Sequence, residues 1–342
     1  MQPSIRKQST QIYSPIPSGN GGVIVHRCLE QNIFNYHLKT FSPKLTLAPP
    51  ILSIFKKKEP KCVHTSVELT AYVSMPHQYS VATIHNYYLD HDYLIRCDPY
   101  RRMYYKTILR RQFLCGLRHA NKIIAVSNTT RDLVLKDLQP NKHIRNKIIT
   151  ILNGVDCEKF TPNKKIDKKD EFNILFSGNP SSRKGWPLVV SIASQLPPNC
   201  TILCTTGMRD LQKLPIVKNI KYLPMIPHEM MPNIYQQVNA LLLPSYREGL
   251  SLAVLEAMAC GLPVIGFNIS SMPEAIVNKQ GGLLVDPNDE ELLIKAINML
   301  ANNTNQCEDY GQYNRERCLQ KFNTLRVIDE YSKAFSEASS FG

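Results

Sequence analysis

Residues 244–265 read PSYREGLSLAVLEAMACGLPVI, and this stretch decides how the rest of the chain is interpreted. The four apolar residues before it, 240–243, predict a buried parallel strand that Pro244 ends. Residues 251–260 are mostly good helix formers followed by Gly261, so they predict a helix with a glycine stop. A strand, a tight loop and a helix place the loop at the carboxyl edge of a parallel sheet, where ligands bind. The helix amino end offers N–H groups and a positive dipole, which suit a phosphate.

Two carboxylates, Glu248 and Glu256, frame the loop and the first turns of this helix. Either one alone is equally well explained by the helix dipole, which stabilises an acid near a helix start. With Pro-Ser before the first glutamate and EAMACGLPVI from the second onward, they form a Glu-x7-Glu signature. This signature resembles the large family 4 of retaining glycosyltransferases, which have the GT-B fold.

The resemblance implies a role for each residue of the signature. Glu248 would hydrogen-bond hydroxyls of a donor sugar, and Glu256 would bind the ribose of its nucleotide. Backbone amides between the two glutamates would hold the diphosphate, namely those of Gly249, Leu250, Ser251 and Leu252. The chemistry agrees, because a diol suits an acceptor-only carboxylate and a diphosphate suits backbone donors and cations.

Arg183 and Lys184 follow the strand predicted at residues 172–177. Adjacent Arg and Lys side chains at a strand's carboxyl end can neutralise a diphosphate, although a surface charge pair is common in any loop. The resemblance matches them to the family's Arg-Lys-Gly diphosphate clamp. Many members carry an arginine directly after the glycine at this strand's exit, where this chain has Asn179, so the clamp is expected to rest on Arg183 and Lys184 alone.

Further landmarks of the family are less specific. Gly21 and Gly22 lie in a glycine-rich turn after the first predicted strand, and the resemblance places them against the donor diphosphate and the acceptor. His85 follows another predicted strand in a Thr-x-His sequence, which in the family faces the donor sugar or the acceptor. Without the resemblance, a flexible loop and a structural histidine are the plainer interpretations. Met225 and Ile226 occupy the loop that meets the nucleobase in the family.

The chain of 342 residues is too long for one ordinary core, and its second half alternates strands and helices strictly. The predicted fold class is α/β, a GT-B arrangement of two Rossmann-like, doubly wound domains that face each other across a cleft. The sequence Asn-Gly-Val-Asp at 153–156 marks the crossing between domains in the family. The predicted domains are an acceptor-binding domain at 1–155, a nucleotide-sugar donor-binding domain at 156–325, and a helix at 326–342 that returns to the first domain.

Positive charge is concentrated in the first half of the chain. Residues 1–152 contain 22 Lys and Arg against 8 Asp and Glu, whereas the remainder contains 19 against 20. This asymmetry implies an anionic partner, either a membrane surface, a phosphorylated acceptor or nucleic acid. The most basic segment, 98–119, predicts an amphipathic helix that lies on a membrane or, equally, a domain helix with a solvated basic face. Its basic stripe is Arg102, Lys106 and Arg110, and its apolar stripe is Tyr105, Leu109 and Phe113.

No run of eighteen apolar residues is present, and the start of the chain lacks the apolar core of a signal peptide. We therefore expect a cytoplasmic protein, at the cytoplasmic face of a membrane if the basic helix binds one. Ten cysteines without a CxxC pair are expected to be reduced and mostly buried.

The predicted function is a retaining hexosyl transfer from a UDP- or GDP-linked sugar to a hydroxyl of a glycan, a lipid-linked or another acceptor. The predicted catalytic residues are Glu248, Arg183, Lys184 and His85, with no cofactor and no metal. One alternative is a catalytically inactive GT-B scaffold that binds anionic lipid or nucleic acid. A second is a GT-B enzyme of other sugar chemistry, such as a phosphorylase or an epimerase. A nucleic acid partner is not favoured, because a pure binding module has no need of a ribose carboxylate.

Overall fold

The structure, a computed structural model, describes residues 10–19, 21–163, 171–206, 214–287 and 289–341. Residues 164–170 of the expected linker and the first nine residues lie outside these ranges. The chain divides into two compact units, and each is described by itself. One unit comprises Met1–Asn153 together with Leu325–Gly342, and the other comprises Gly154–Thr324.

The first unit is built on a six-stranded parallel sheet of order β2-β1-β3-β4-β5-β6. Its strands are β1 (Ile12–Pro17), β2 (Tyr36–Phe41), β3 (Cys62–Ser66), β4 (Tyr79–Ile84), β5 (Lys122–Ala125) and β6 (Ile148–Thr150). β1, β3 and β4 are buried along their whole length. Such continuous burial is expected of parallel strands that are covered on both faces.

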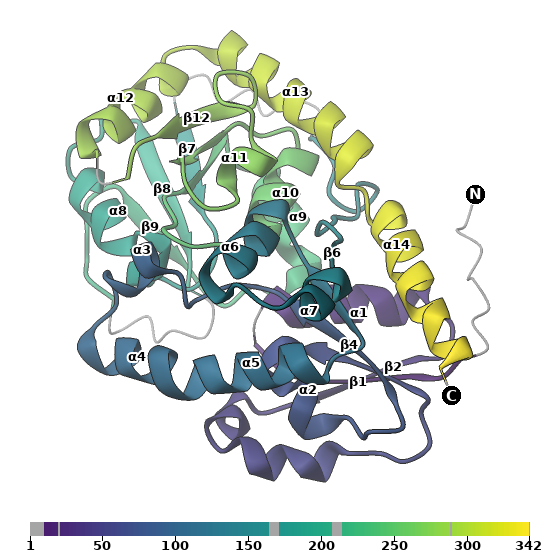
Figure 1. Cartoon of the computed structure of the whole chain (residues 1–342). Coiled ribbons are helices and arrows are strands. Elements are labelled where there is room, and N and C mark those ends of the chain that lie inside the picture. The colour runs from purple at the N-terminus through teal and green to yellow at the C-terminus, as the bar shows by residue number, and fades with distance from the viewer. Residues whose placement is uncertain (1–9, 20, 164–170, 207–213, 288, 342) are drawn as a thin grey trace. The chain divides into compact units, whose positions relative to one another are not determined.

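Helices connect these strands. They are α1 (Gly21–Asn32), α2 (Val67–Val73), α3 (His91–Leu94), α4 (Pro99–Tyr104), α5 (Arg110–His119), α6 (Asn128–Leu138) and α7 (Lys142–Lys147), with short 3-10 helices η1 (Pro43–Leu47) and η2 (Pro49–Phe55). α2 packs between η2 and α5, beneath β3 and β4 (Figure 1).

The last helix, α14 (Thr324–Ser336), and the 3-10 turn η7 (Glu337–Ser340) contact the first sheet. Glu337 accepts a hydrogen bond from the Tyr79 hydroxyl at 2.7 Å and pairs with Lys122 Nζ at 2.6 Å. Tyr331 and Phe335 are buried on the same helix. The C-terminal segment is therefore an integral part of the first unit.

The second unit contains another six-stranded parallel sheet, of order β12-β11-β10-β7-β8-β9. Its strands are β7 (Phe172–Phe176), β8 (Cys200–Thr205), β9 (Ile220–Leu223), β10 (Ala240–Leu243), β11 (Val264–Phe267) and β12 (Gly282–Val285). Its helices are α8 (Trp186–Ala193), α9 (Met231–Tyr235), α10 (Leu252–Ala259), α11 (Met272–Ala275), α12 (Glu290–Ala301) and α13 (Thr304–Lys321), with 3-10 turns η4 (Ser182–Lys184) and η6 (His228–Met230). Alternate strand residues such as Phe176, Leu242 and Ile265 point to one face and form a core with α8 and α12.

The two Rossmann-like α/β sheets confirm the predicted fold class. β1 runs through two prolines to its end at Pro17. β1 pairs with β3 only at Ile12 and Tyr13, so the prolines lie where β1 has a strand neighbour on one side only.

The basic segment 98–119 also differs from the prediction. α4 and α5 form one rod with a π-helical turn between them, at Tyr105–Leu109 (Figure 1). Arg102 does not belong to a solvated stripe, because its guanidinium donates to the carbonyl oxygens of Leu94, Ile95 and Cys97 at 2.9 to 3.1 Å. Phe113 of the apolar stripe lies in the core, as the alternative of a domain helix with a solvated basic face predicts.

Candidate functional site

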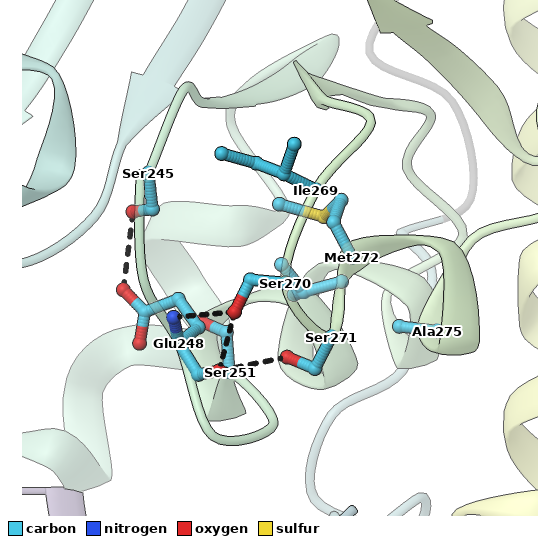
Figure 2. Close-up of a pocket in the computed structure, with 9 residues that line it drawn as sticks. Ser245, Glu248, Ser251, Ile269, Ser270, Ser271, Met272 and Ala275 are labelled. Carbon is cyan, nitrogen blue, oxygen red and sulfur yellow. Dashed lines mark hydrogen bonds between the residues drawn. The ribbon is translucent and has the colours of Figure 1, made fainter. Parts of the chain in front are cut away.

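Glu248 lies in the loop between β10 and α10, and two cations from the exit of β7 pair with its carboxylate. Arg183 Nη1 donates to Glu248 Oε1 at 2.8 Å, and Lys184 Nζ lies 3.8 Å from the same oxygen. Ser245 Oγ also donates to Oε1, at 3.1 Å. Figure 2 shows the other oxygen pointing away from Ser245. Within the described residues, Oε2 is therefore the carboxylate oxygen that remains for a ligand.

Two cations share this one carboxylate in a site that is largely screened from water. Burial raises the pKa of Glu248, but the charges of Arg183 and Lys184 outweigh burial and hold that pKa below its usual value. Burial lowers the pKa of the Lys184 amine, and the neighbouring Glu248 charge opposes that effect. When all three groups are ionised the cluster carries one surplus positive charge, which favours an anionic ligand such as a diphosphate.

Two glycines allow the cation pair to approach the sheet closely. Gly178, at φ +112°, lies against Lys184, and a Cβ there would be 2.7 Å from Nζ. Gly185, at φ +73°, ends η4, and a Cβ there would be 2.2 Å from the carbonyl oxygen of Pro244. Arg183 and Lys184 therefore sit in a defined 3-10 turn, where the sequence predicted only a loop.

The stretch between the two glutamates leads into the amino end of α10. Ser251 is the N-cap residue, and its side chain makes no capping hydrogen bond. Leu252 is the first helical residue, while Gly249 and Leu250 form the preceding turn. The N–H groups of the first turn thus have no side-chain acceptor from the cap, an arrangement that suits an anion.

A second loop fixes the backbone of Glu248. Ser270, at φ +58°, accepts from the Glu248 N–H at 3.1 Å and donates to the Glu248 carbonyl oxygen at 2.8 Å. Ser271 donates to the same carbonyl at 3.3 Å. Together these residues line a small pocket beside Glu248, with the apolar side chains of Ile269 and Met272 on its other wall (Figure 2).

Glu256 lies on α10, one turn after its start, and only 6% of its surface is exposed. Both carboxylate oxygens are engaged. His228 Nε2 lies 2.6 Å from Oε1, and the Tyr235 hydroxyl donates to Oε2 at 2.9 Å. Each carboxylate oxygen has two lone-pair sites, so this carboxylate is fixed in position and still able to accept from a ligand diol.

Met225 and Ile226 precede η6, the turn that carries His228. The Met225 side chain is 67% exposed, and Ile226 is half-buried. They thus precede His228, the residue that contacts Glu256, by three and two positions in the chain.

The other predicted residues belong to the first unit. His85 follows the carboxyl end of β4 and is half-buried, and burial lowers its pKa to about 4, so it is neutral at pH 7. Gly21 and Gly22, which the sequence placed in a turn, are the first residues of α1. A Cβ on Gly21 would meet nothing within 4 Å, so the fold itself does not require glycine there.

Four residues of the site were missed in the sequence, namely Ser245, Ser270, His228 and Tyr235. His228 and Tyr235 reach Glu256 from 28 and 21 residues away, so no local spacing reveals them. Ser270 adopts a positive φ that serine rarely takes, which a sequence does not show. Ser245 had a signal, because it stands three residues before a carboxylate that it can reach.

Among the described residues, no group of three His, Cys, Asp or Glu side chains is placed to hold a metal ion. The chain does contain an Asp-x-Asp sequence at 90–92. Asp90 caps α3 by accepting from the Tyr93 N–H at 3.1 Å, and Asp92 lies exposed in that helix.

Solved structures share the fold. Sucrose-phosphate synthase from Thermosynechococcus elongatus matches 97% of this chain and 100% of its own with a TM-score of 0.80 at 19% identity. HepE of Anabaena, solved in complex with UDP-glucose, matches 96% and 100% with a TM-score of 0.74 at 16% identity. At these identities the likeness concerns the fold.

Curated relatives match parts of the chain. Alpha-maltose-1-phosphate synthase of Mycolicibacterium smegmatis is 24% identical over 253 residues, which cover 65% of this chain and 64% of that protein. D-inositol 3-phosphate glycosyltransferase of Mycobacteroides abscessus is 29% identical over 165 residues, covering 43% and 37%. The chain thus spans less than two thirds of the length of these relatives.

Two family models match consecutive parts of the chain. Residues 11–159 match Glycosyltransferase Family 4, and residues 158–317 match Glycosyl transferases group 1. The chain belongs to the family 4 glycosyltransferases of the GT-B fold. Every candidate residue of this family member lies within the matched ranges.

Replacement of Glu256 by alanine tests its role in this family member. We expect Glu256→Ala to weaken binding of a nucleoside diphosphate by roughly 1.5 to 3 kcal/mol, about 10- to 150-fold in Kd, because a diol loses a charged acceptor. Titration calorimetry with UDP and GDP measures the loss. Tyr235→Phe is the control, since it keeps the carboxylate and should weaken binding far less. Unchanged affinity in a folded Glu256→Ala protein would remove Glu256 from the ribose role.

Proposed function

We propose that the chain is a retaining glycosyltransferase that moves a sugar from a UDP- or GDP-linked donor to a hydroxyl group of an acceptor. The observation that carries this proposal is the Glu248 cluster. It combines a carboxylate with one oxygen left for a sugar hydroxyl and two cations beside it, in the same unit as the Glu256 carboxylate. A donor made of sugar, diphosphate and ribose needs those three kinds of group.

In the proposed reaction, Arg183 and Lys184 stabilise the diphosphate as the bond to the sugar breaks. Negative charge grows on the leaving group at that point, so preorganised cations and the amino end of α10 lower the barrier. Other transferases use a metal ion for the same electrostatic task, and we propose that here the two side chains supply it. Retention would follow from attack on the face that the leaving group vacates, with the departing phosphate as base.

Structural neighbours support a nucleotide-linked donor, whereas the names of the relatives point to different acceptors or products. The relatives act, by name, in the synthesis of alpha-maltose-1-phosphate and on D-inositol 3-phosphate. HepE was solved with UDP-glucose, and TarM of S. aureus with UDP and alpha-GlcNAc-glycerol. We propose a glycan or lipid-linked hydroxyl as the acceptor of this chain.

Two alternatives remain open to experiment. An inactive scaffold that only binds anionic lipid or nucleic acid would have no use for two fixed carboxylates and an open Oε2 on Glu248. A phosphorylase or epimerase would use the same groups but would release different products.

A donor screen followed by product analysis decides among these functions. We expect one UDP- or GDP-sugar to bind with Kd below about 1 mM, which is usual for enzyme substrates. NMR of the product should show the anomeric configuration of the donor. Binding without transfer to any acceptor would favour the inactive scaffold. An inverted anomer, a sugar phosphate or an epimerised nucleotide sugar would refute the proposed retaining transfer.

We also propose that the first unit binds an anionic membrane surface, which would hold the protein at the cytoplasmic face. The rod of α4 and α5 exposes apolar side chains between cations, with Tyr100 83%, Met103 63% and Ile108 46% exposed. Lys106 and Arg110 are exposed beside them. A surface of interspersed aliphatic, aromatic and basic side chains suits the boundary between lipid headgroups and acyl chains.

A second segment of the first unit has the same character. η1 and η2 expose Leu47, Ile51 and Ile54 at 69%, 48% and 68%, and exposed lysines follow at 56–58. Because α2 packs against both η2 and α5, the two segments flank one helix. Among the described residues, no helix is long and apolar enough to cross a membrane.

Vesicle co-sedimentation tests the membrane proposal. Each basic residue near an anionic surface contributes about 1 kcal/mol, so Lys106→Glu/Arg110→Glu should reduce binding to phosphatidylserine vesicles at least about tenfold. The charge-matched control is Lys136→Glu/Lys142→Glu, at exposed positions on other helices of the unit. Salt near 1 M should release the protein, because the Debye length falls to about 3 Å. Equal binding to neutral vesicles, or binding only to a DNA duplex, would contradict the proposal.

A further inference from the structure

A network of seven polar side chains connects four strands of the first sheet with α1, α14 and His85. Six of its members are buried, and all but His85 come from secondary-structure elements. The members are Ser14 on β1, His26 on α1, Tyr36 on β2, His64 on β3, Thr83 on β4, His85 and Tyr331 on α14. Such a set of converging groups costs free energy to bury unless each is hydrogen-bonded.

His26 is the member that touches His85. Its Nε2 lies 3.1 Å from His85 Nε2, and its Nδ1 lies 2.7 Å from Ser14 Oγ and 2.8 Å from the Tyr36 hydroxyl. Both nitrogens of His26 are therefore occupied. Within the described residues, the recorded hydrogen bond of His85 uses Nε2, so Nδ1 is the nitrogen that remains for a substrate.

The rest of the network supports His26. The His64 ring stacks on the His26 ring with centroids 4.2 Å apart. His64 Nδ1 lies 2.7 Å from the Tyr36 hydroxyl, and its Nε2 lies 2.8 Å from Thr83 Oγ1. Thr83 in turn lies 3.2 Å from the Tyr331 hydroxyl. His26 is therefore contacted from β1, β2 and β3, and β4 and α14 hold His64 in turn.

The histidines of this network are neutral at pH 7. Burial, followed by the mutual repulsion of the imidazoles, lowers the pKa of His26 well below its usual value. Burial has the same first effect on His64 and His85. Because a neutral imidazole carries one N–H, only one of the two facing Nε2 atoms can hold the proton. The tautomer of His26 consequently determines the tautomer of His85.

We propose that His26 is a positioning residue that fixes both the ring orientation and the tautomer of His85, so that His85 presents a defined Nδ1 to a hydroxyl of the sugar or the acceptor. This inference rests on the proposed glycosyl transfer and adds a residue to it. A ring held in one state avoids the entropic cost of ordering it during each turnover. His26 lies on α1, which begins with Gly21 and Gly22. One helix therefore carries both glycines and the residue that contacts His85.

Nitrogen NMR of histidine-labelled protein tests the geometry without any substrate. We expect His85, identified by its loss in His85→Gln, to show one neutral tautomer at pH 7. In His26→Phe, which keeps ring volume, His85 should show averaged tautomers. In His26→Gln the side-chain amide replaces Nε2, and the single tautomer should return. The control His119→Phe removes a half-buried histidine of α5, which is not a member of the network, and should leave the tautomer of His85 fixed.

Steady-state kinetics tests the consequence. Removal of a residue that orients a metal-binding side chain typically lowers activity 10- to 100-fold. We expect a similar fall in kcat for His26→Phe, with donor KM changed less than about threefold. His26→Gln should recover most of kcat. If His26→Phe does not fold, Tyr36→Phe removes the hydroxyl that holds His26 and is measured in its place.

Two results would overturn the inference. One is a mixture of tautomers at His85 in the unmodified protein. The other is a kinetic result, either full kcat in His26→Phe or an equal fall of kcat in His26→Phe and His26→Gln. Should the unmodified protein transfer no sugar, the proposed function fails, whereas the NMR result still decides whether His26 positions His85.

Discussion

The pairing of Glu248 with Arg183 and Lys184 is the interaction on which the proposed site depends. Its members come from the exits of β7 and β10, which are neighbours in the second sheet although more than sixty residues separate them in sequence. Parallel strands end at one edge, so the two loops meet only if both strands are in register. Both strands are buried along their whole length, and Ala240 and Leu241 pair with Ile174 and Leu175. Hydrophobic packing of the sheet thus sets the distance between the charges.

Burial of these three charged side chains costs free energy, because it removes their hydration. An additional donor from Ser245 and a second loop at Ser270 reduce that cost by satisfying Glu248. The cluster still carries one positive charge more than its carboxylate neutralises, and Glu248 Oε2 can still accept a hydrogen bond. A sugar diphosphate supplies both the hydroxyl and the negative charge that such a site lacks. The local arrangement is therefore better explained by binding than by stability.

The sequence predicted the parts of the site that local patterns encode. The signature placed Glu248 and Glu256 on a strand, loop and helix because apolar runs, prolines and glycines mark those boundaries. It did not reveal His228 or Tyr235, since their contacts with Glu256 arise only from tertiary packing. The same holds for the network around His85, whose members are spread from Ser14 to Tyr331. Amphipathic periodicity also misplaced Arg102, which caps a neighbouring helix instead of belonging to a solvated stripe.

The central claim is that Arg183 and Lys184 act on charge that develops as the donor bond breaks. The most direct measurement is kcat and donor KM of the Arg183→Ala/Lys184→Ala protein beside the charge-conserving Arg183→Lys/Lys184→Arg protein. The account predicts a fall in kcat of about 100-fold or more for the alanine protein, with donor KM changed less than about threefold, and partial recovery in the charge-conserving one. A rise in KM with kcat intact would contradict it, because the two cations would then only hold the donor in its ground state.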